Sequence, residues 1–212
     1  MAEGTLVITI SNQVAPPLVV SPPLTMEFIT GWHVPTKTEM ETLYTYLGGV
    51  GVAAGSMKET GIIYWNDPNV GATNSCGFSS KGSGYRLYNT GAFGPFRISF
   101  NMWSITEGTG GNVGFYYELE NQSSSDNITA AWRSPKYGHS IRLIKDDSTD
   151  PGTVIDYDGN IYPTVKIGTQ VWMAANLATT HYADGTAIPI VTDNAAWAAL
   201  TTAGMCYYNN TP

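Results

Sequence analysis

Charged side chains are scarce in this chain of 212 residues. They make up 13% of the sequence, about half of the roughly 25% that is typical of soluble domains. The formal net charge is -7, and no cluster of Lys and Arg interrupts that acidic balance. Because binding to a phosphate backbone needs positive charge, we expect no nucleic-acid partner. The uncharged polar surface that remains is typical of extracellular or particle-exposed proteins.

Long apolar runs and a recognisable export signal are also missing. No uninterrupted apolar run approaches the roughly 18 residues that cross a bilayer, so we expect no membrane insertion. Residues 1–4 do not begin a basic segment followed by an apolar one, and we therefore expect no export signal. The apolar content of 42% is nevertheless enough to close a core.

Cysteine and histidine are too few and too scattered to predict a metal site. Cys76 and Cys206 lie far apart and in no metal-like spacing, so two free, partly buried thiols are expected, with a long-range disulfide as the alternative. His33, His139 and His181 stand in unrelated segments without a partner at helical spacing. We expect hydrogen-bonding roles for them, no metal and no catalytic residue.

One amphipathic helix is clearly predicted over residues 37–47. Thr36 and Glu39 have the spacing of a capping box. Apolar residues follow at the spacing that places them on one helical face, and Gly48 and Gly49 end the run. The chain then predicts short aromatic strands separated by Gly and Asn turns, which indicates an α+β fold. These strands are expected over residues 85–88, 98–103, 115–120 and 140–145.

Four segments are predicted along the chain. Residues 1–28 form an N-terminal β arm for attachment or oligomerisation, with a strand over residues 5–11 and a Pro-rich connector. Residues 29–146 form the first block, residues 147–155 a linker rich in turn residues, and residues 156–212 the second block. In this last block, strands over residues 161–167 and 170–173 and a short helix beginning near Thr192 are expected.

Both blocks resemble the Fibrobacter succinogenes major paralogous domain, found in surface and secreted proteins of Bacteroidetes-like bacteria and in some of their phages. In the first block the matching stretches are 31–36, 58–61, 64–66, 71–74, 77–78, 84–86, 103–107 (Trp-Ser-Ile-Thr-Glu) and 136–142 (Lys-Tyr-Gly-His-Ser-Ile-Arg). In the second block they are 156–162 (Asp-Tyr-Asp-Gly-Asn-Ile-Tyr), 165–168, 172–173, 176–177, 184–186, 188–189 and 206–210.

The resemblance implies a branch of the C-type-lectin-like fold, with a twisted antiparallel sheet, two flanking helices and long irregular loops. It also implies that the two halves stand in exchanged order, because the block like residues 156–210 comes first in the family. The chain is then a circular permutation, a window cut from an array of such domains, or a subunit that completes its neighbour. Formylglycine-generating enzymes of this superfamily use cysteines in the active site, but neither Cys76 nor Cys206 can be matched to those cysteines.

The stretch Trp65-Asn66-Asp67 resembles a calcium-binding element of lectins of this fold, since its oxygen atoms suit that ion. The second loop that completes such a calcium site in lectins is absent, and the residue types of 67–71 favour an ordinary turn equally well. We therefore expect no cofactor, with calcium as the lesser alternative. Among the six tryptophans, Trp65 is the one expected to be exposed for sugar stacking, together with Asn66, Asp67 and Asn69. The other five are expected in the core.

A second candidate binding surface follows from the Tyr/Asn/Ser-rich segment that contains Tyr116, Tyr117 and Asn121, a mixture that suits adaptable recognition. An ordinary solvated hairpin explains the segment equally well. The strand with Ser104, Thr106 and Glu107 is interpreted as structural, because no histidine lies near it in the sequence.

The preferred function is a non-enzymatic recognition or adhesion module that binds a bacterial surface glycan or protein. We expect it on a phage virion, as a fibre or capsid decoration subunit that forms homo-oligomers or contacts other virion proteins. A secreted or cell-surface bacterial protein is the alternative setting. Two other functions stay open: a coat or fibre subunit that polymerises by complementation between chains, and an enzyme assembled from scattered residues.

Overall fold

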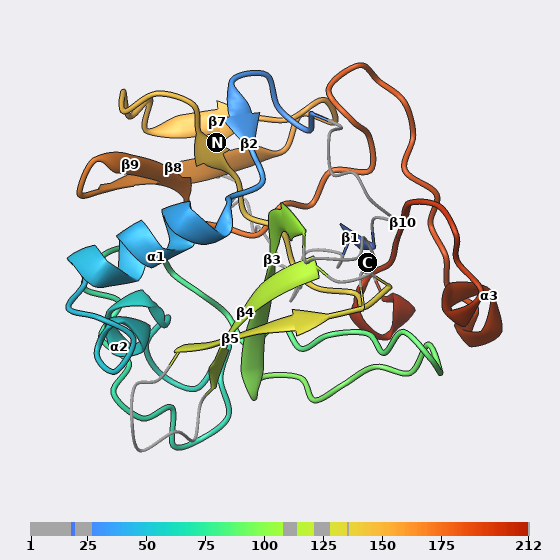
Figure 1. The fold of residues 1–212 in the computed structure, drawn as a ribbon, viewed down its shortest axis with the longest axis horizontal. Helices are drawn as coiled ribbons and strands as arrows, with labels where there is room; N and C mark the ends of the chain where they lie inside the picture. The colour runs from blue at the N-terminus through green and yellow to red at the C-terminus, as the bar shows by residue number, and fades with distance from the viewer. Residues whose placement is uncertain (1–17, 20–26, 108–113, 121–127, 135, 212) are drawn as a thin grey trace, which may run out of the picture.

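A computed structural model describes residues 18–19, 27–107, 114–120, 128–134 and 136–211 of the chain. The helices are α1 (Lys37–Tyr46), α2 (Ala53–Met57), α3 (Asn194–Ala198) and a 3-10 helix at Tyr208–Asn210. Within the described residues, no helix combines the length and apolar character that crossing a membrane would require. Short helices and strands joined by long irregular segments make up the structure (Figure 1).

In the described part of the chain, ten strands pair antiparallel in three sheets. The five-stranded sheet has the order β2-β6-β9-β8-β7, the three-stranded sheet the order β3-β4-β5, and β1 pairs with β10. Their bounds are β1 (Leu18–Val19), β2 (Trp32–His33), β3 (Ser99–Glu107), β4 (Gly114–Glu120), β5 (Ile128–Arg133), β6 (Ile144–Lys145), β7 (Thr153–Ile155), β8 (Ile161–Ile167), β9 (Gln170–Met173) and β10 (Gly204–Met205).

Helix α1 begins with the predicted capping box. The hydroxyl of Thr36 accepts a hydrogen bond from the Glu39 amide (3.2 Å), and the Glu39 carboxylate accepts one from the Thr36 amide (2.8 Å). Two amides of the first turn that would otherwise lack a partner are thus satisfied. Met40, Leu43 and Tyr44 are buried, so the predicted helix and its apolar face are confirmed.

The five-stranded sheet lies between two apolar cores. Neighbouring residues of a strand point to opposite faces, and Trp172 accordingly packs in the core under α1 and α2, while Val171 and Met173 pack in the core on the other side. Leu143 and Ile144 divide between the cores in the same way. Each core is thus built from both halves of the chain.

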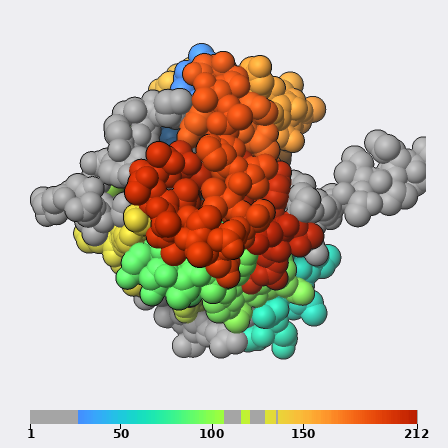
Figure 2. All heavy atoms as spheres, turned by 90° about the vertical axis from the view of Figure 1, so that its right-hand side faces the viewer, coloured from blue at the N-terminus to red at the C-terminus, as the bar shows by residue number. Residues whose placement is uncertain are grey.

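Two buried arginines also join the halves. Arg142 donates from Nε to the side-chain oxygen of Asn176 (2.7 Å), and Arg86 donates to the carbonyls of Val191 (2.6 Å) and Thr192 (2.9 Å). Both guanidinium groups are fully buried. A buried charge or a buried carbonyl oxygen without a hydrogen bond would destabilise the fold, and these bonds avoid that cost. Figure 2 shows the C-terminal segment lying across one face of the molecule, against the segment that contains Arg86.

The segment predicted as a linker is part of this body. Residues 147–152 form an exposed connection, and residues 153–155 form β7, which pairs with β8. The turn residues of this connection join β6 and β7, which belong to one sheet, and the division of the chain at this linker stays a prediction. The halves therefore meet within one chain, and the order of the family's halves stays a prediction.

Other strand predictions were confirmed in part. Strands β3, β4, β8 and β9 lie where they were expected, with Gly168 and Thr169 forming the turn of the β8–β9 hairpin. Residues 85–88 make isolated bridges only, and residues 140–145 contribute only the two residues of β6. The α+β class holds, while the C-type-lectin-like assignment stays a prediction. The strand expected over residues 5–11 lies outside the described residues.

The tryptophan predictions were right for four side chains. Trp32, Trp103, Trp172 and Trp197 are buried. Trp132 was expected in the core and is 44% exposed. It lies on β5, which is the edge strand of the three-stranded sheet.

Candidate functional site

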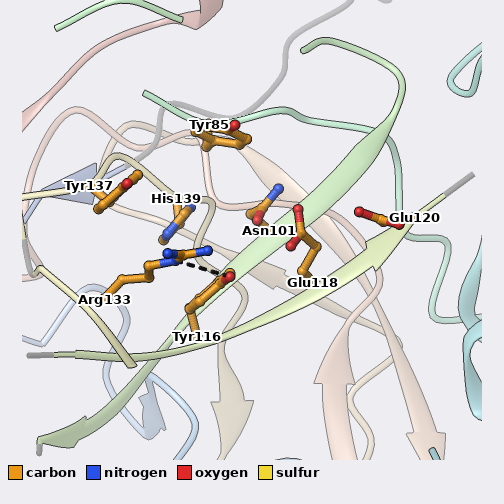
Figure 3. A pocket seen from close by; sticks show the side chains of 8 residues that line it. All are labelled: Tyr85, Asn101, Tyr116, Glu118, Glu120, Arg133, Tyr137 and His139. Carbon is orange, nitrogen blue, oxygen red and sulfur yellow. Dashed lines mark hydrogen bonds between the residues drawn. The ribbon is translucent and has the colours of Figure 1, made fainter. Parts of the chain in front are cut away.

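A polar cavity of about 250 Å³ opens on the three-stranded sheet (Figure 3). Its lining combines aromatic rings, two carboxylates, an amide and a guanidinium group. The lining residues are Tyr85, Asn101, Tyr116, Glu118, Glu120, Arg133, Tyr137 and His139. Such a mixture of ring faces and hydrogen-bonding groups is typical of sites that bind polar organic molecules.

Strand alternation builds one wall of this cavity. Tyr116, Glu118 and Glu120 stand at every second position of β4 and therefore share one face. The residues between them, Tyr117 and Leu119, point into the core under α1. Asn101 of β3 is the register partner of Glu118, so its amide lies beside that carboxylate.

A stack of aromatic rings continues from Tyr116 along the cavity. The ring of His139 lies between Tyr116 and Tyr137, with centroid distances of 4.8 and 5.6 Å and an interplanar angle of 10° in each pair. The edge of Trp103 supports the same imidazole at 4.5 Å. Nε of Arg133 donates to the Tyr116 hydroxyl (3.2 Å) at the rim. Figure 3 shows the side chains that line the cavity, with Tyr85, Tyr137 and His139 on one side of the view and Arg133 next to Tyr116.

His139 is buried without hydrogen bonds. Neither of its ring nitrogens has a hydrogen-bond partner among the described residues. Burial lowers the pKa of His139 to about 3, and the nearby charge of Arg133 acts in the same direction. The ring is therefore neutral at physiological pH, with one nitrogen that can donate a hydrogen bond and one that can accept.

Glu118 is the carboxylate most affected by the cavity. Burial raises its pKa above the ordinary value, and the charge of Glu120 adds to this, while hydrogen bonds with Ser99 and Asn101 and the charge of Arg133 act the other way. No ion pair within 4.0 Å is found for Glu118 or Glu120 among the described residues. The cavity thus holds two carboxylates and one guanidinium group.

The predicted exposure of Trp65 was wrong. Its side chain is fully buried, and its indole nitrogen donates to the Ser80 carbonyl (3.0 Å). The turn residues after it indicated a segment that faces solvent, but the ring belongs to the core under α1 and α2. Trp65 therefore cannot stack on a sugar.

The residues after Trp65 form a turn. The amide of Asn69 donates to the carbonyl of Asn66 (3.2 Å), and its side-chain nitrogen donates to the carbonyls of Glu59 (3.0 Å) and Gly61 (2.8 Å). Asp67 is exposed. Among the described residues, no group of three His, Cys, Asp or Glu side chains could hold a metal ion. The turn interpretation accounts for these contacts without calcium.

Of the second predicted surface, Tyr116 lines the cavity. Tyr117 does not, because it faces the core and donates from its hydroxyl to the Lys37 carbonyl (3.2 Å). Asn121 lies outside the described residues. Sequence reasoning missed the other seven lining residues, although the alternation within residues 116–120 was a signal that could have separated the two faces of the strand.

The remaining hydroxyl and thiol groups have structural surroundings. Ser104 is buried and accepts from the Thr106 amide, and the Thr106 hydroxyl accepts from the Lys37 amide (2.8 Å). Cys76 and Cys206 are both free, as expected. Burial raises the pKa of Cys206 to about 11, so its thiol is a poor nucleophile.

One hydroxyl–histidine contact lies on the surface. The Thr180 hydroxyl is 3.0 Å from Nδ1 of His181, and Asp158 contacts the same nitrogen at 2.5 Å. In a Ser-His-Asp type of relay, the nucleophile and the carboxylate bind opposite ring nitrogens. This cluster therefore lacks the geometry of a catalytic triad.

Comparison with known families gives one match. Residues 30–145 match the model of the Fibrobacter succinogenes major domain, and this stretch contains every residue that lines the cavity. No curated protein and no solved structure matches the chain. Since the match covers more than half of the sequence, the chain belongs to the Fibrobacter succinogenes major domain family.

Proposed function

We propose that the chain is a non-enzymatic recognition module that binds a surface glycan in the cavity on the three-stranded sheet. The observation that carries this proposal is the lining itself: tyrosine rings stand beside carboxylate, amide and guanidinium groups in one cavity of about 250 Å³. Sugars present apolar ring faces and hydroxyl groups, which such a lining can contact together.

The chemistry around the cavity favours binding over catalysis. Glu118 and Glu120 could in principle serve as an acid and a base, but they are neighbours on one strand face and both approach a ligand from the same side. Hydrolysis of a glycosidic bond uses carboxylates that flank the bond. His139 has no hydroxyl or thiol partner among the described residues.

The setting of this module is part of the proposal. A surface with few charges and many Ser, Thr, Asn and Gly residues suits a phage virion or a bacterial cell surface. Both halves of one chain supply strands to the five-stranded sheet. This supports a recognition module more than a subunit that takes a strand from its neighbour.

A glycan array followed by isothermal titration calorimetry tests the proposal. Arg133→Ala removes an exposed guanidinium group at the rim, and we expect it to weaken binding about tenfold or more, because hydrogen bonds to charged groups are strong. Lys166→Ala is the matched control, since Lys166 is exposed on the other sheet. Equal binding by both variants, or no glycan ligand on the array, would contradict the proposal.

A further inference from the structure

The charges around the cavity are unbalanced. Glu118 is half-buried and Glu120 is exposed, and neither belongs to an ion pair among the described residues. Arg133 comes from β5, and its Nε donates to the Tyr116 hydroxyl instead of pairing with either carboxylate (Figure 3). A ligand at the Glu118 side therefore meets net negative charge.

A second, independent observation points to a ligand at this place. His139 is 2% exposed and lines the cavity, and its two buried ring nitrogens have no hydrogen-bond partner among the described residues. A buried polar group without a hydrogen bond is unfavourable, and a ligand that supplies the bond removes this cost. A hydroxyl group can either donate or accept, so it can satisfy whichever ring nitrogen it reaches in a neutral imidazole.

We propose that the ligand is an amino sugar with a free ammonium group, which Glu118 and Glu120 bind while its hydroxyl groups contact Asn101 and His139. This inference rests on the proposed glycan function and specifies its ligand class. A uronic acid would place a third carboxylate beside the two of β4, where like charges repel. An N-acetylated sugar has the same ring but lacks the positive charge.

Titration calorimetry with three oligosaccharides tests this inference: a glucosamine trimer, its N-acetylated form and a galacturonic acid trimer. We expect the glucosamine trimer to bind about tenfold more tightly than the N-acetylated form. Added salt should weaken its binding, because the ammonium–carboxylate attraction is screened. The galacturonic acid trimer is expected to bind weakest.

Two substitutions separate charge from shape. Glu118→Gln keeps the size of the side chain, and we expect it to weaken binding of the glucosamine trimer about tenfold while leaving the N-acetylated trimer unchanged. His139→Phe keeps a ring between Tyr116 and Tyr137 and is expected to weaken both. Glu41→Gln, on the exposed side of α1, is the matched control and should change neither. Thermal unfolding of each variant verifies that it folds.

The possible results distinguish this inference from the proposed function. If the N-acetylated trimer binds as tightly as the glucosamine trimer, or if Glu118→Gln leaves the difference intact, the amino-sugar inference is overturned. Binding of either trimer that Arg133→Ala weakens still supports the glycan function in that case. If none of the three trimers and no other glycan binds, both proposals fail.

Discussion

His33 is the residue whose protonation we expect to have the clearest effect on stability. Its two ring nitrogens contact carboxylates on both sides: Nε2 lies 2.9 Å from Glu39 and Nδ1 lies 2.6 Å from Asp146. The hydrogen bond with Glu39 raises the pKa of His33 to about 9, although partial burial acts against it. The imidazolium ion therefore connects the start of α1 to the end of β6.

This arrangement predicts a pH-dependent stability. The pKa of His33 in the folded protein lies above its ordinary value of 6.5, so the stabilisation is fully present below about pH 6.5 and is lost as the pH rises through 9. Because the side chain is 35% exposed, screening limits the contribution to about 1 kcal/mol. We expect His33→Gln to unfold at lower urea concentration at pH 6, and the gap from the unchanged protein to close near pH 10. A gap of constant size would contradict this account.

Residue types alone did not identify the candidate site. Tyr116 and Tyr117 are adjacent residues of the same type, yet Tyr116 lines the cavity and Tyr117 lies in the core. The alternation of β4 separates them only once the buried face is known. His139 could not be found from the sequence, because its ring stack joins β4 to a segment beyond β5.

At the scale of elements, the turn at Gly91 fixes the position of α3. Gly91 has a φ of +66°, and a Cβ atom there would lie 2.6 Å from Cα of Asn194, the first residue of α3. Gly152 has a similar φ of +79°, but a Cβ atom there would meet nothing within 4 Å. The two positions share the backbone conformation and differ in the space around it.

This pair predicts two different costs for the same substitution. We expect Gly152→Ala to lower the free energy of unfolding by about 1 kcal/mol, the cost of a left-handed alanine. Gly91→Ala adds a collision with α3, and a loss of roughly 3 kcal/mol or more is expected. Urea unfolding measures both. Equal losses would show that α3 can move away from Gly91 freely.

Sequence patterns predicted best those elements whose structure depends on residues close together in the chain. The capping box and the β8–β9 hairpin depend on residues a few positions apart, and both were confirmed. Residues 140–143 have the same apolar pattern as a strand, but Arg142 bonds to the Ser79 carbonyl and to Asn176. These partners are distant in sequence, so only the tertiary structure shows why a regular strand begins at Ile144.

For the whole molecule, the folded body extends beyond the residues that match the family model. Residues 30–145 match the family model, but β6, which pairs with β2 on one side, pairs on the other side with β9 of the second half. Both cores also take side chains from residues 156–212. The first half alone would expose these apolar faces. Arg86 would lose the carbonyls of Val191 and Thr192, and Arg142 would lose the side-chain oxygen of Asn176.

We therefore predict that a chain ending at residue 146 does not fold. Its near-ultraviolet circular dichroism should lack the signal of fixed aromatic side chains, and its amide NMR spectrum should be poorly dispersed. Mixing it with a separate fragment of residues 147–212 should restore both signals, since the cut lies in an exposed connection. A well-dispersed spectrum from the first fragment alone would show that the halves are independent.

The burial of the tryptophans has an optical consequence. Trp32, Trp65, Trp103, Trp172 and Trp197 are each at most 4% exposed, and Trp132 is 44% exposed. A small quencher such as acrylamide can thus reach the fluorescence of Trp132 in the native protein, while the emission of the other five indoles stays protected until the chain unfolds. Because Trp132 adjoins Arg133 on β5, the quenchable fraction of the light also reports on the strand that borders the cavity.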